Sequence, residues 1–312
     1  MGPILNVIFP IFAIMAAGYA AGHFRLLGSE SSEALNRFVY FIALPALFFV
    51  SMARVSLEEV FNLPFLGAYG GGAAATFVIA VAVAKVAFPN RLGALGLAGL
   101  SGIFSNTGYM GIPLLMLAYG EAGMLPAIIS TILNGAVIMA LGIILLELDV
   151  HQGKSRLVVL KNVLRGVVRS PLVLSAVAGL LVSGLGIPLP QALGTFSDIL
   201  GASAGPCALF AIGLFMVGKS PTAGITEVSW LVFLKLLVQP LITWALAYHV
   251  FTMEPVWAAG ALVQSALPTG ALVFVLAQQY GIYVQRSTAV IMASTVLSLI
   301  TLSALFVYLG IG

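Results

Sequence analysis

Long stretches of this chain contain no charged side chain, and this feature limits the folds open to it more than any other. Of its 312 residues, 61% are hydrophobic and only 7% are charged, whereas soluble domains carry about 25% charged residues. A water-soluble fold would lack the polar side chains needed to cover its surface. The chain is therefore predicted to lie mainly in lipid, where helices satisfy their own backbone groups.

Apolar runs long enough to cross a bilayer occur ten times, separated by glycine, proline and charged residues. A membrane-spanning helix needs about 20 such residues. The predicted spans are 4–23, 34–53, 63–87, 92–118, 122–147, 170–186, 193–217, 226–251, 255–280 and 284–309. We expect an all-α polytopic membrane protein, whose first span is retained because no basic segment typical of a cleaved signal peptide precedes it.

The basic residues between the spans indicate how the chain is oriented. Cytoplasmic loops of membrane proteins are enriched in lysine and arginine. If the loop 148–169 is cytoplasmic, eleven of the 13 basic residues face the cytoplasm, Arg54 faces outward and Lys235 lies within a span. Both termini are then expected outside the cytoplasm. The net charge of +3 thus reports orientation and predicts no nucleic-acid partner.

The chain repeats itself weakly. Tyr119-Gly120 returns 161 residues later as Tyr280-Gly281, and Ser130-Thr131 returns 164 residues later as Ser294-Thr295. Because each half holds five spans, an odd number, the halves are expected to have opposite orientations, as in many secondary transporters. The predicted domains are a first inverted repeat over 1–147, a basic cytoplasmic loop over 148–169 and a second inverted repeat over 170–312.

Spans 4 and 9 occupy corresponding positions in the two halves, and both contain helix-breaking and small polar residues near mid-membrane. Backbone groups freed by a break cannot face lipid, so they must line a cavity within the protein. The N-terminus of a half-helix there offers N–H groups to an anion. A simple proline kink is the alternative for either span alone. The residues concerned are Ser105, Asn106, Thr107, Gly108, Gly111 and Pro113 in span 4, and Ser265, Pro268, Thr269 and Gly270 in span 9.

These two segments resemble a known family. Asn106-Thr107-Gly108-x-Met110-Gly111-Ile112-Pro113 and Ala266-Leu267-Pro268-x-Gly270 look like the motifs of the auxin efflux carriers, which include plant PIN proteins and bacterial permeases. The resemblance extends along all ten spans, and the short central loop favours the bacterial type. The family's crossover asparagine maps onto Asn106.

The resemblance implies a fold related to bile-acid sodium symporters. Spans 1, 2, 6 and 7 would form a scaffold that also makes a homodimer. Spans 3–5 and 8–10 would form a moving transport domain, in which the crossed, broken spans 4 and 9 hold the carboxylate of an organic anion.

Lys235 is the one charged residue deep within a span. Such residues are costly in a bilayer and are functional candidates for that reason. We expect Lys235 to face the transport core, where it attracts the anion or holds a polar cluster together; the alternative is a lysine that reaches toward the headgroups. No carboxylate occupies either broken helix, which favours an anion over Na⁺ or H⁺ as the transported species. Asn134 in span 5 is expected to hydrogen-bond between helices, and contact with substrate remains open.

Other classes of function have weaker signals. Gly99-Leu100-Ser101-Gly102 resembles the nucleophile motif of intramembrane serine proteases, but His249 is expected too far from Ser101 to act as its base. The single cysteine, Cys207, and the three histidines do not suit a metal site, so we expect no metal, no cofactor and no catalytic residue. A receptor or sensor that uses the same fold without transport is a third possibility.

The sequence thus predicts an elevator-type secondary transporter for a small organic anion, a carboxylate, in a bacterial inner membrane. Export is favoured for an uncoupled carrier, because each negative charge expelled at −100 mV gains about 2.3 kcal/mol.

Overall fold

The structure is a computed structural model that describes residues 9–54, 62–88, 91–150, 171–218 and 224–311. Within these ranges every regular element is a helix, and the single β-type contact is a bridge between Ser105 and Thr269. The predicted all-α class is therefore confirmed. The predicted basic loop 148–169 lies outside the described residues beyond Val150, as does Lys219.

Helices of the first half follow the first five predicted spans. In chain order they are α1 (Phe9–His23); α2 (Ser29–Phe38), the π-helical turn η2 (Val39–Ala43) and α3 (Leu44–Ala53); α5 (Leu63–Ala87); α6 (Leu92–Ile103); the π-helical turn η3 (Thr107–Gly111) and α7 (Ile112–Tyr119); the 3₁₀ turn η4 (Gly120–Gly123); and α8 (Met124–Ile132), the π-helical turn η5 (Leu133–Ile138) and α9 (Met139–Val150).

Helices of the second half follow the remaining predicted spans. They are α11 (Pro171–Gly184); α12 (Gln191–Ala202) and α13 (Ala204–Met216); α14 (Ile225–Phe233), the π-helical turn η6 (Leu234–Val238), α15 (Gln239–Ala245) and the π-helical turn η7 (Leu246–Val250); α16 (Pro255–Ala266) and α17 (Leu272–Tyr280); and α18 (Val284–Tyr308).

Three of the π-helical turns have a common local cause in the sequence. The turns η2, η3 and η6 each end two residues before a proline, namely Pro45, Pro113 and Pro240. A proline ring inside an α-helix clashes with the carbonyl four residues earlier and cannot donate a hydrogen bond. The wider π turn relieves this clash, so these helices continue past their prolines.

Six helical segments among the described residues are long and apolar enough to cross a membrane: Glu30–Ala53, Leu63–Ala87, Thr107–Leu146, Gln191–Met216, Ile225–Val250 and Val284–Tyr308. Phe9–His23, Leu92–Ile103 and Pro171–Gly184 are shorter apolar helices. Large apolar side chains such as Phe41, Leu181 and Ile300 are exposed, as suits a surface in contact with lipid. The chain is therefore a multi-pass membrane protein, while the count of ten spans and the inverted relation of the halves stay predictions.

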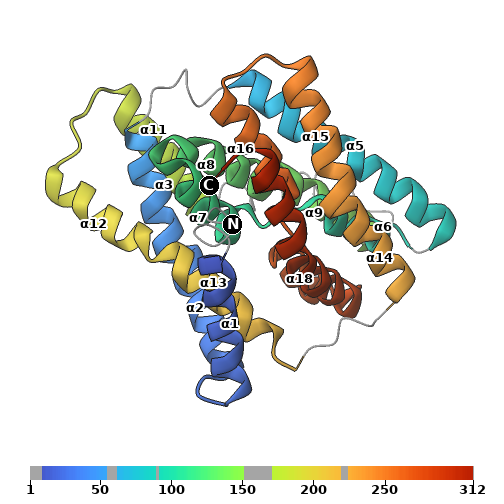
Figure 1. The fold of residues 1–312 in the computed structure, drawn as a ribbon. Coiled ribbons are helices and arrows are strands. Elements are labelled where there is room, and N and C mark those ends of the chain that lie inside the picture. The colour runs from blue at the N-terminus through green and yellow to red at the C-terminus, as the bar shows by residue number, and fades with distance from the viewer. Residues whose placement is uncertain (1–8, 55–61, 89–90, 151–170, 219–223, 312) are drawn as a thin grey trace.

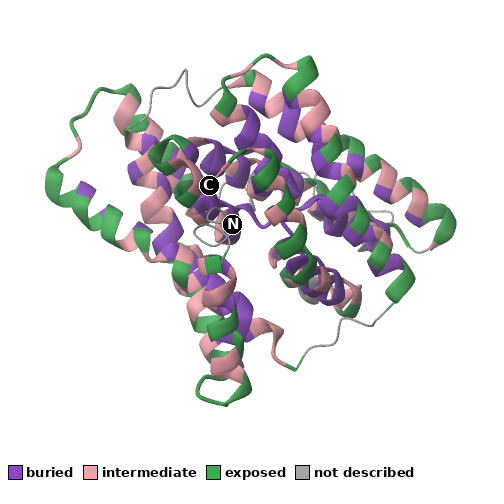
Figure 2. Cartoon of the chain, viewed as in Figure 1, coloured by how far each residue is buried: buried purple, intermediate pink, exposed green. Residues whose placement is uncertain are grey.

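The helices form two groups that lie side by side (Figure 1). In the group that we call the α13 group, α13 packs on α1 and α2, and α3 packs on α11 and α12. In the α16 group, α5 packs on α6, α15 and α16, while α18 packs on α14, α16 and α17. Contacts of η3 with α13 and of α8 with α3 join the two groups. Buried residues are concentrated along this junction and within the α16 group (Figure 2).

Candidate functional site

Two helices of the α16 group stop abruptly, and the segments that follow them pair with each other. After α6 ends at Ile103 and α16 ends at Ala266, Phe104 and Leu267 adopt extended backbone conformations. The Asn106 N–H donates to the Pro268 carbonyl at 2.9 Å, and the Gly270 N–H donates to the Phe104 carbonyl at 2.8 Å. The backbone groups freed at each break are thus partly satisfied by the other break, and we call this pairing the crossover.

The helix after the first break resumes directly at the crossover. Its first turn, η3, is π-helical, and the Asn106 carbonyl accepts hydrogen bonds from the N–H groups of both Met110 and Gly111 at 3.1 Å. Four half-helix ends therefore lie near the crossover: the C-termini of α6 and α16, and the N-termini of η3 and α17. Helix N-termini carry partial positive charge and C-termini carry partial negative charge. The region therefore presents partial charges of both signs to a ligand.

The break in span 4 lies earlier in the chain than predicted. Gly108 and Gly111 belong to the π-helical turn η3, and Pro113 follows in the first turn of α7. The non-helical residues are Phe104, Ser105 and Asn106, because these must extend to pair with Pro268 and Gly270. Gly111 and Pro113 therefore lie after the break and do not form it, whereas Pro268 and Gly270 do lie at the break in span 9.

Gly111 has a packing role that explains why it is a glycine. A Cβ atom at this position would collide with the side-chain oxygen of Gln264 and would lie 2.7 Å from Cδ1 of Leu267. The glycine therefore lets the Gln264 amide lie directly against the backbone of η3. Gly270 is similarly enclosed, since its Cβ would lie 3.0 Å from the Phe104 ring.

Asn134 of η5 connects the first break to two other helices. Its Nδ2 donates to the Ser105 carbonyl at 3.0 Å and to Thr107 Oγ1 at 3.2 Å. Its Oδ1 accepts from the hydroxyl of Tyr69 on α5 at 3.1 Å. Asn134 thus makes hydrogen bonds between helices, as expected, and these hold the extended segment around Ser105 in place.

Thr269 of the second break is held in the same way. Its hydroxyl donates to the Ser101 carbonyl on α6 at 2.7 Å, and its N–H donates to Ser294 Oγ on α18 at 3.1 Å. Each break is therefore fixed by hydrogen bonds to helices outside its own span, and its position is defined by tertiary contacts.

Lys235 of η6 lies at the C-terminal end of α16. Its ammonium group donates to the Ser265 carbonyl at 2.6 Å and to Gln239 Oε1 at 2.7 Å, and the residue is 0% exposed. A positive charge here stabilises the carbonyl groups that α16 leaves unpaired where it stops. Lys235 thus holds a polar cluster together inside the protein instead of extending to the headgroups.

The crossover is covered in this conformation. Asn106 is 8% exposed, and Ser105, Thr107, Ser265 and Thr269 are buried. The α13 group provides part of the cover: a Cβ at Gly205 of α13 would lie 3.1 Å from Pro113, and a Cβ at Gly108 would lie 3.7 Å from Leu44 of α3. The described helices therefore bury the crossover in this conformation.

Three carboxylates outside the crossover form ion pairs. Glu227 is bound by Arg286 at 2.9 Å and by the Tyr283 hydroxyl, Asp149 by Arg91 at 3.4 Å, and Asp198 by Arg54 at 2.8 Å. Burial, together with the hydrogen bond to Glu227, raises the pKa of Tyr283 above its ordinary value, so its phenol stays protonated and keeps donating. Lys235 is the charged residue that the described part of the chain places at the crossover.

The residues predicted to form the site lie at or near the crossover, and three neighbours that were not predicted lie against them. Tyr69, Gln239 and Gln264 lie in contact with Asn134, Lys235 and Gly111 respectively. Gln239 could have been found from its position four residues after Lys235, which places both on one helix face. Tyr69 gives no comparable signal, because its partner lies 65 residues away.

Ser101, the candidate nucleophile of the protease hypothesis, is buried within α6. Its hydroxyl donates to the Leu97 carbonyl one turn earlier at 2.8 Å. This is the usual hydrogen bond of a serine inside an apolar helix, and within the described part of the chain no hydrogen bond joins Ser101 to a histidine. Among the described residues, no three His, Cys, Asp or Glu side chains come close enough to hold a metal ion.

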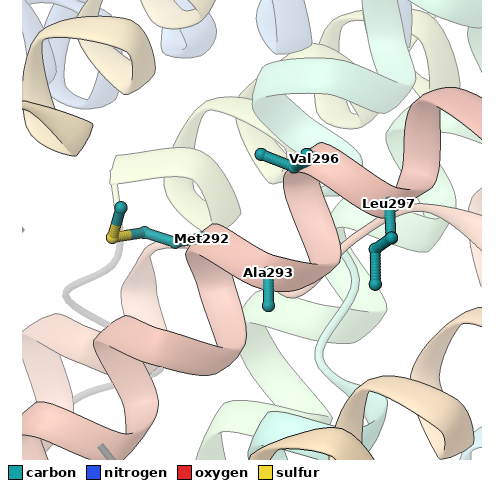
Figure 3. Close-up of a pocket in the computed structure, with 4 residues that line it drawn as sticks. All are labelled: Met292, Ala293, Val296 and Leu297. Atoms are coloured by element: carbon teal, nitrogen blue, oxygen red, sulfur yellow. The ribbon is translucent and has the colours of Figure 1, made fainter. Parts of the chain in front are cut away.

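A hollow in the surface of α18 has a different character. Met292, Ala293, Val296 and Leu297 line it, and all are apolar (Figure 3). It offers no hydrogen-bonding side chain to an anion and suits the hydrocarbon of a lipid.

Interrupted helices that cross inside a multi-pass helical protein are typical of secondary transporters. A family model described as membrane transport protein matches residues 3–306, so the chain belongs to this family. The resemblance to the auxin efflux carriers is thereby confirmed.

Relatives of known name match along most of the chain. A Rhizobium meliloti (strain 1021) protein named "Putative malonate transporter" is 28% identical over 312 residues, which cover 100% of this chain and 98% of that protein. The "Uncharacterized transporter YfdV" of Escherichia coli (strain K12) is 26% identical, with 97% and 96% covered. The "Lysosomal cholesterol signaling protein" of Mus musculus is 28% identical over 74% of this chain but only 28% of its own length.

Proposed function

We propose that this protein is a secondary transporter that carries a small organic anion across the membrane and binds its carboxylate at the crossover. The observation that carries the proposal is the character of that region: half-helix N-termini, neutral hydrogen-bonding side chains and one ammonium group lie together there, with no carboxylate on either break. Cation/proton antiporters of related architecture need an acidic residue at such a place. A site of this composition favours a negatively charged substrate.

The carboxylate would bind at the N-terminal end of η3. Backbone N–H groups in the first turn of a helix lack intrahelical acceptors and bind anions. The Asn106 side chain stands at this N-terminus, with Thr107 and Gly108 in the first turn. Ser105, Ser265, Pro268, Thr269 and Gly270 would shape the site, and Asn134 would hold it in position.

Lys235 would contribute positive potential from the end of α16. An ammonium group has three protons to donate, and the hydrogen bonds to Ser265 and Gln239 engage two of them. The described residues supply no third acceptor, so the remaining proton is available to the substrate. The charge would favour an anion over a neutral molecule of the same shape.

The name of the Rhizobium meliloti relative supports carboxylates as the substrate class. That protein is named for malonate, a small dicarboxylate, and matches this chain from end to end. Mono- and dicarboxylates of similar size are therefore the first substrates to test.

Transport would follow an elevator mechanism. The α13 group (spans 1, 2, 6 and 7) would form a stationary scaffold and a homodimer, and the α16 group with α7 and α8 would move the crossover from one membrane side to the other. Since the crossover is buried beneath α3 and α13, sliding between the groups would uncover it. Without a coupling ion, the membrane potential would drive the anion outward.

Flux through the purified protein in proteoliposomes tests the proposal. Vesicles loaded with radiolabelled malonate should release it faster than protein-free vesicles, and an inside-negative potential set with K⁺ and valinomycin should accelerate the release. Absence of carboxylate flux through folded, reconstituted protein would contradict the proposal.

The match to the mouse signalling protein supports a second candidate, a membrane receptor that binds a ligand without moving it. The same vesicles separate the two functions. A receptor would bind a ligand in a thermal-shift screen but would release none from loaded vesicles.

A further inference from the structure

Gln264 is a buried polar residue beside the crossover that lies outside the proposed carboxylate site. It lies one residue before Ser265 in the last turn of α16 and is 0% exposed. Neither its amide oxygen nor its amide nitrogen has a hydrogen-bond partner among the described residues. Leaving both ends of a buried amide unpaired is costly, so the position of this side chain calls for an explanation.

The packing around Gln264 fixes the position of its amide against the backbone of η3. Gln264 lies against Gly111, where any larger residue would displace it. The Gly111 N–H in turn donates to the carbonyl of Asn106. Gly111 therefore lies one hydrogen-bonded turn after Asn106, about 5 Å along the helix axis, and the Gln264 amide lies against it. That separation suits the two ends of a short, bifunctional molecule.

The chemistry of the amide selects the kind of group that would satisfy it. Its NH₂ donates and its oxygen accepts, so one partner satisfies both ends only if it can accept and donate. A hydroxyl, a carboxamide or a protonated carboxyl has this property, whereas a carboxylate only accepts and an alkyl group does neither. The carboxylate at the other end of the molecule would be bound by the partial positive charge at the start of η3 and by Lys235.

We propose that Gln264 contacts the substrate and determines its specificity, by binding a second, uncharged polar group of the anion while the carboxylate binds at the start of η3. This inference rests on the proposed function. It narrows the substrate class to small monoanions that carry a hydroxyl, carboxamide or protonated carboxyl near the carboxylate, including the singly charged form of a short diacid.

A matched pair of monoanions tests this inference. In 3-hydroxypropionate a hydroxyl replaces the terminal methyl of butyrate, so the two differ only in the distal group. Their dissociation constants are measured by isothermal titration on wild-type protein, on Gln264→Met, which removes the amide at similar volume, and on Gln191→Met. Gln191 is exposed at the start of α12 and serves as the control.

Wild type and Gln191→Met should bind 3-hydroxypropionate at least about tenfold more tightly than butyrate, because a site with hydrogen-bonding groups rejects an analogue that leaves them unpaired. In Gln264→Met the ratio should fall to about twofold or less, through weaker binding of the hydroxy acid alone. An unchanged ratio, or an equal loss for both anions, would overturn the inference.

Two further results keep the test decisive. If Gln264→Met does not fold, Gln264→Asn, which shortens the amide, should also lower the ratio. A wild-type ratio near one overturns the inference without any variant. Failure of the proposed function looks different: neither anion would bind to wild type or cross the vesicle membrane.

Discussion

At the scale of single residues, the ammonium group of Lys235 stabilises a helix end that would otherwise be left with unpaired carbonyls in the membrane. A charge in this environment is costly unless it is paired or hydrogen-bonded. Lys235 meets this condition with neutral partners, the Ser265 carbonyl and Gln239. The described residues place no carboxylate beside Lys235, so the protonated form of this lysine makes the region attractive to anions.

Replacing Lys235 with methionine should abolish most transport. The change removes the charge and leaves the Ser265 carbonyl and Gln239 Oε1 without their donor, and each unpaired buried group costs about 1–3 kcal/mol. We expect carboxylate flux in proteoliposomes to fall at least about tenfold, since 1.4 kcal/mol corresponds to that factor. Lys85→Met, which removes an exposed lysine in the last turn of α5, should keep its flux. Full flux in Lys235→Met would exclude the lysine from the mechanism.

The sequence revealed the depth of Lys235 but could not reveal its partners. Charge and hydropathy are local properties, so a lysine ten residues into an apolar span can be identified without a structure. The Ser265 carbonyl lies 30 residues away in the chain, and Tyr69 lies 65 residues from Asn134. Such contacts depend on how the helices pack, and no local pattern encodes them.

At the scale of helices, the breaks were predictable and their form was not. Proline and glycine in mid-span are strong local signals, and both spans do stop being helical. The π-helical turn η3, however, keeps Gly108 and Gly111 in helical conformation and moves the break back to Phe104, Ser105 and Asn106. The pairing with Pro268 and Gly270 decides this, and it forms only when the two spans meet.

Close packing of α1 on α13 depends on glycines at their contact. A Cβ at Gly213 would collide with the Met15 carbonyl oxygen, and a Cβ at Gly18 would collide with the Phe210 carbonyl oxygen. Small residues let membrane helices approach closely and gain dispersion contacts. The contact between α1 and α13 therefore cannot accommodate even one added methyl group without a backbone shift.

Gly213→Ala should lower stability, because the methyl group forces the two helices apart at a cost of about 1–3 kcal/mol. Gly135→Ala is the matched control, since an added Cβ in η5 meets nothing within 4 Å, and alanine favours helix by up to about 1 kcal/mol over glycine. Thermal unfolding followed by tryptophan fluorescence should show a lower midpoint for the first variant and an equal or higher midpoint for the second. Equal midpoints for both would contradict the tight contact.

At the scale of the whole molecule, the proposed elevator mechanism requires that the α13 group and the α16 group change their relative position. An aromatic contact joins them where the α13 helix approaches its end: the rings of Phe215 on α13 and Phe274 on α17 are T-shaped with centroids 5.0 Å apart. An elevator movement would have to separate this pair, whereas a fixed receptor would have no need to do so.

A reversible cross-link between these positions should stop transport. Phe215→Cys and Phe274→Cys are combined in a Cys207→Ala background, which removes the chain's single native cysteine. A short bifunctional thiosulfonate reagent should then block carboxylate flux, and dithiothreitol should restore it. The single-cysteine variants treated in the same way should be unaffected. Undiminished flux through the cross-linked protein would argue against relative movement of the two groups.

The most direct test of carboxylate binding at the crossover is isothermal titration of malonate into wild type and Asn106→Ala. The Asn106 side chain stands at the start of η3, while its backbone N–H and carbonyl make the structural hydrogen bonds, so alanine should leave the fold intact. The affinity should fall at least about tenfold, as expected when a hydrogen bond to a charged group is lost, with an unchanged melting temperature in the absence of ligand. Equal affinity of the two proteins would contradict carboxylate binding at this site.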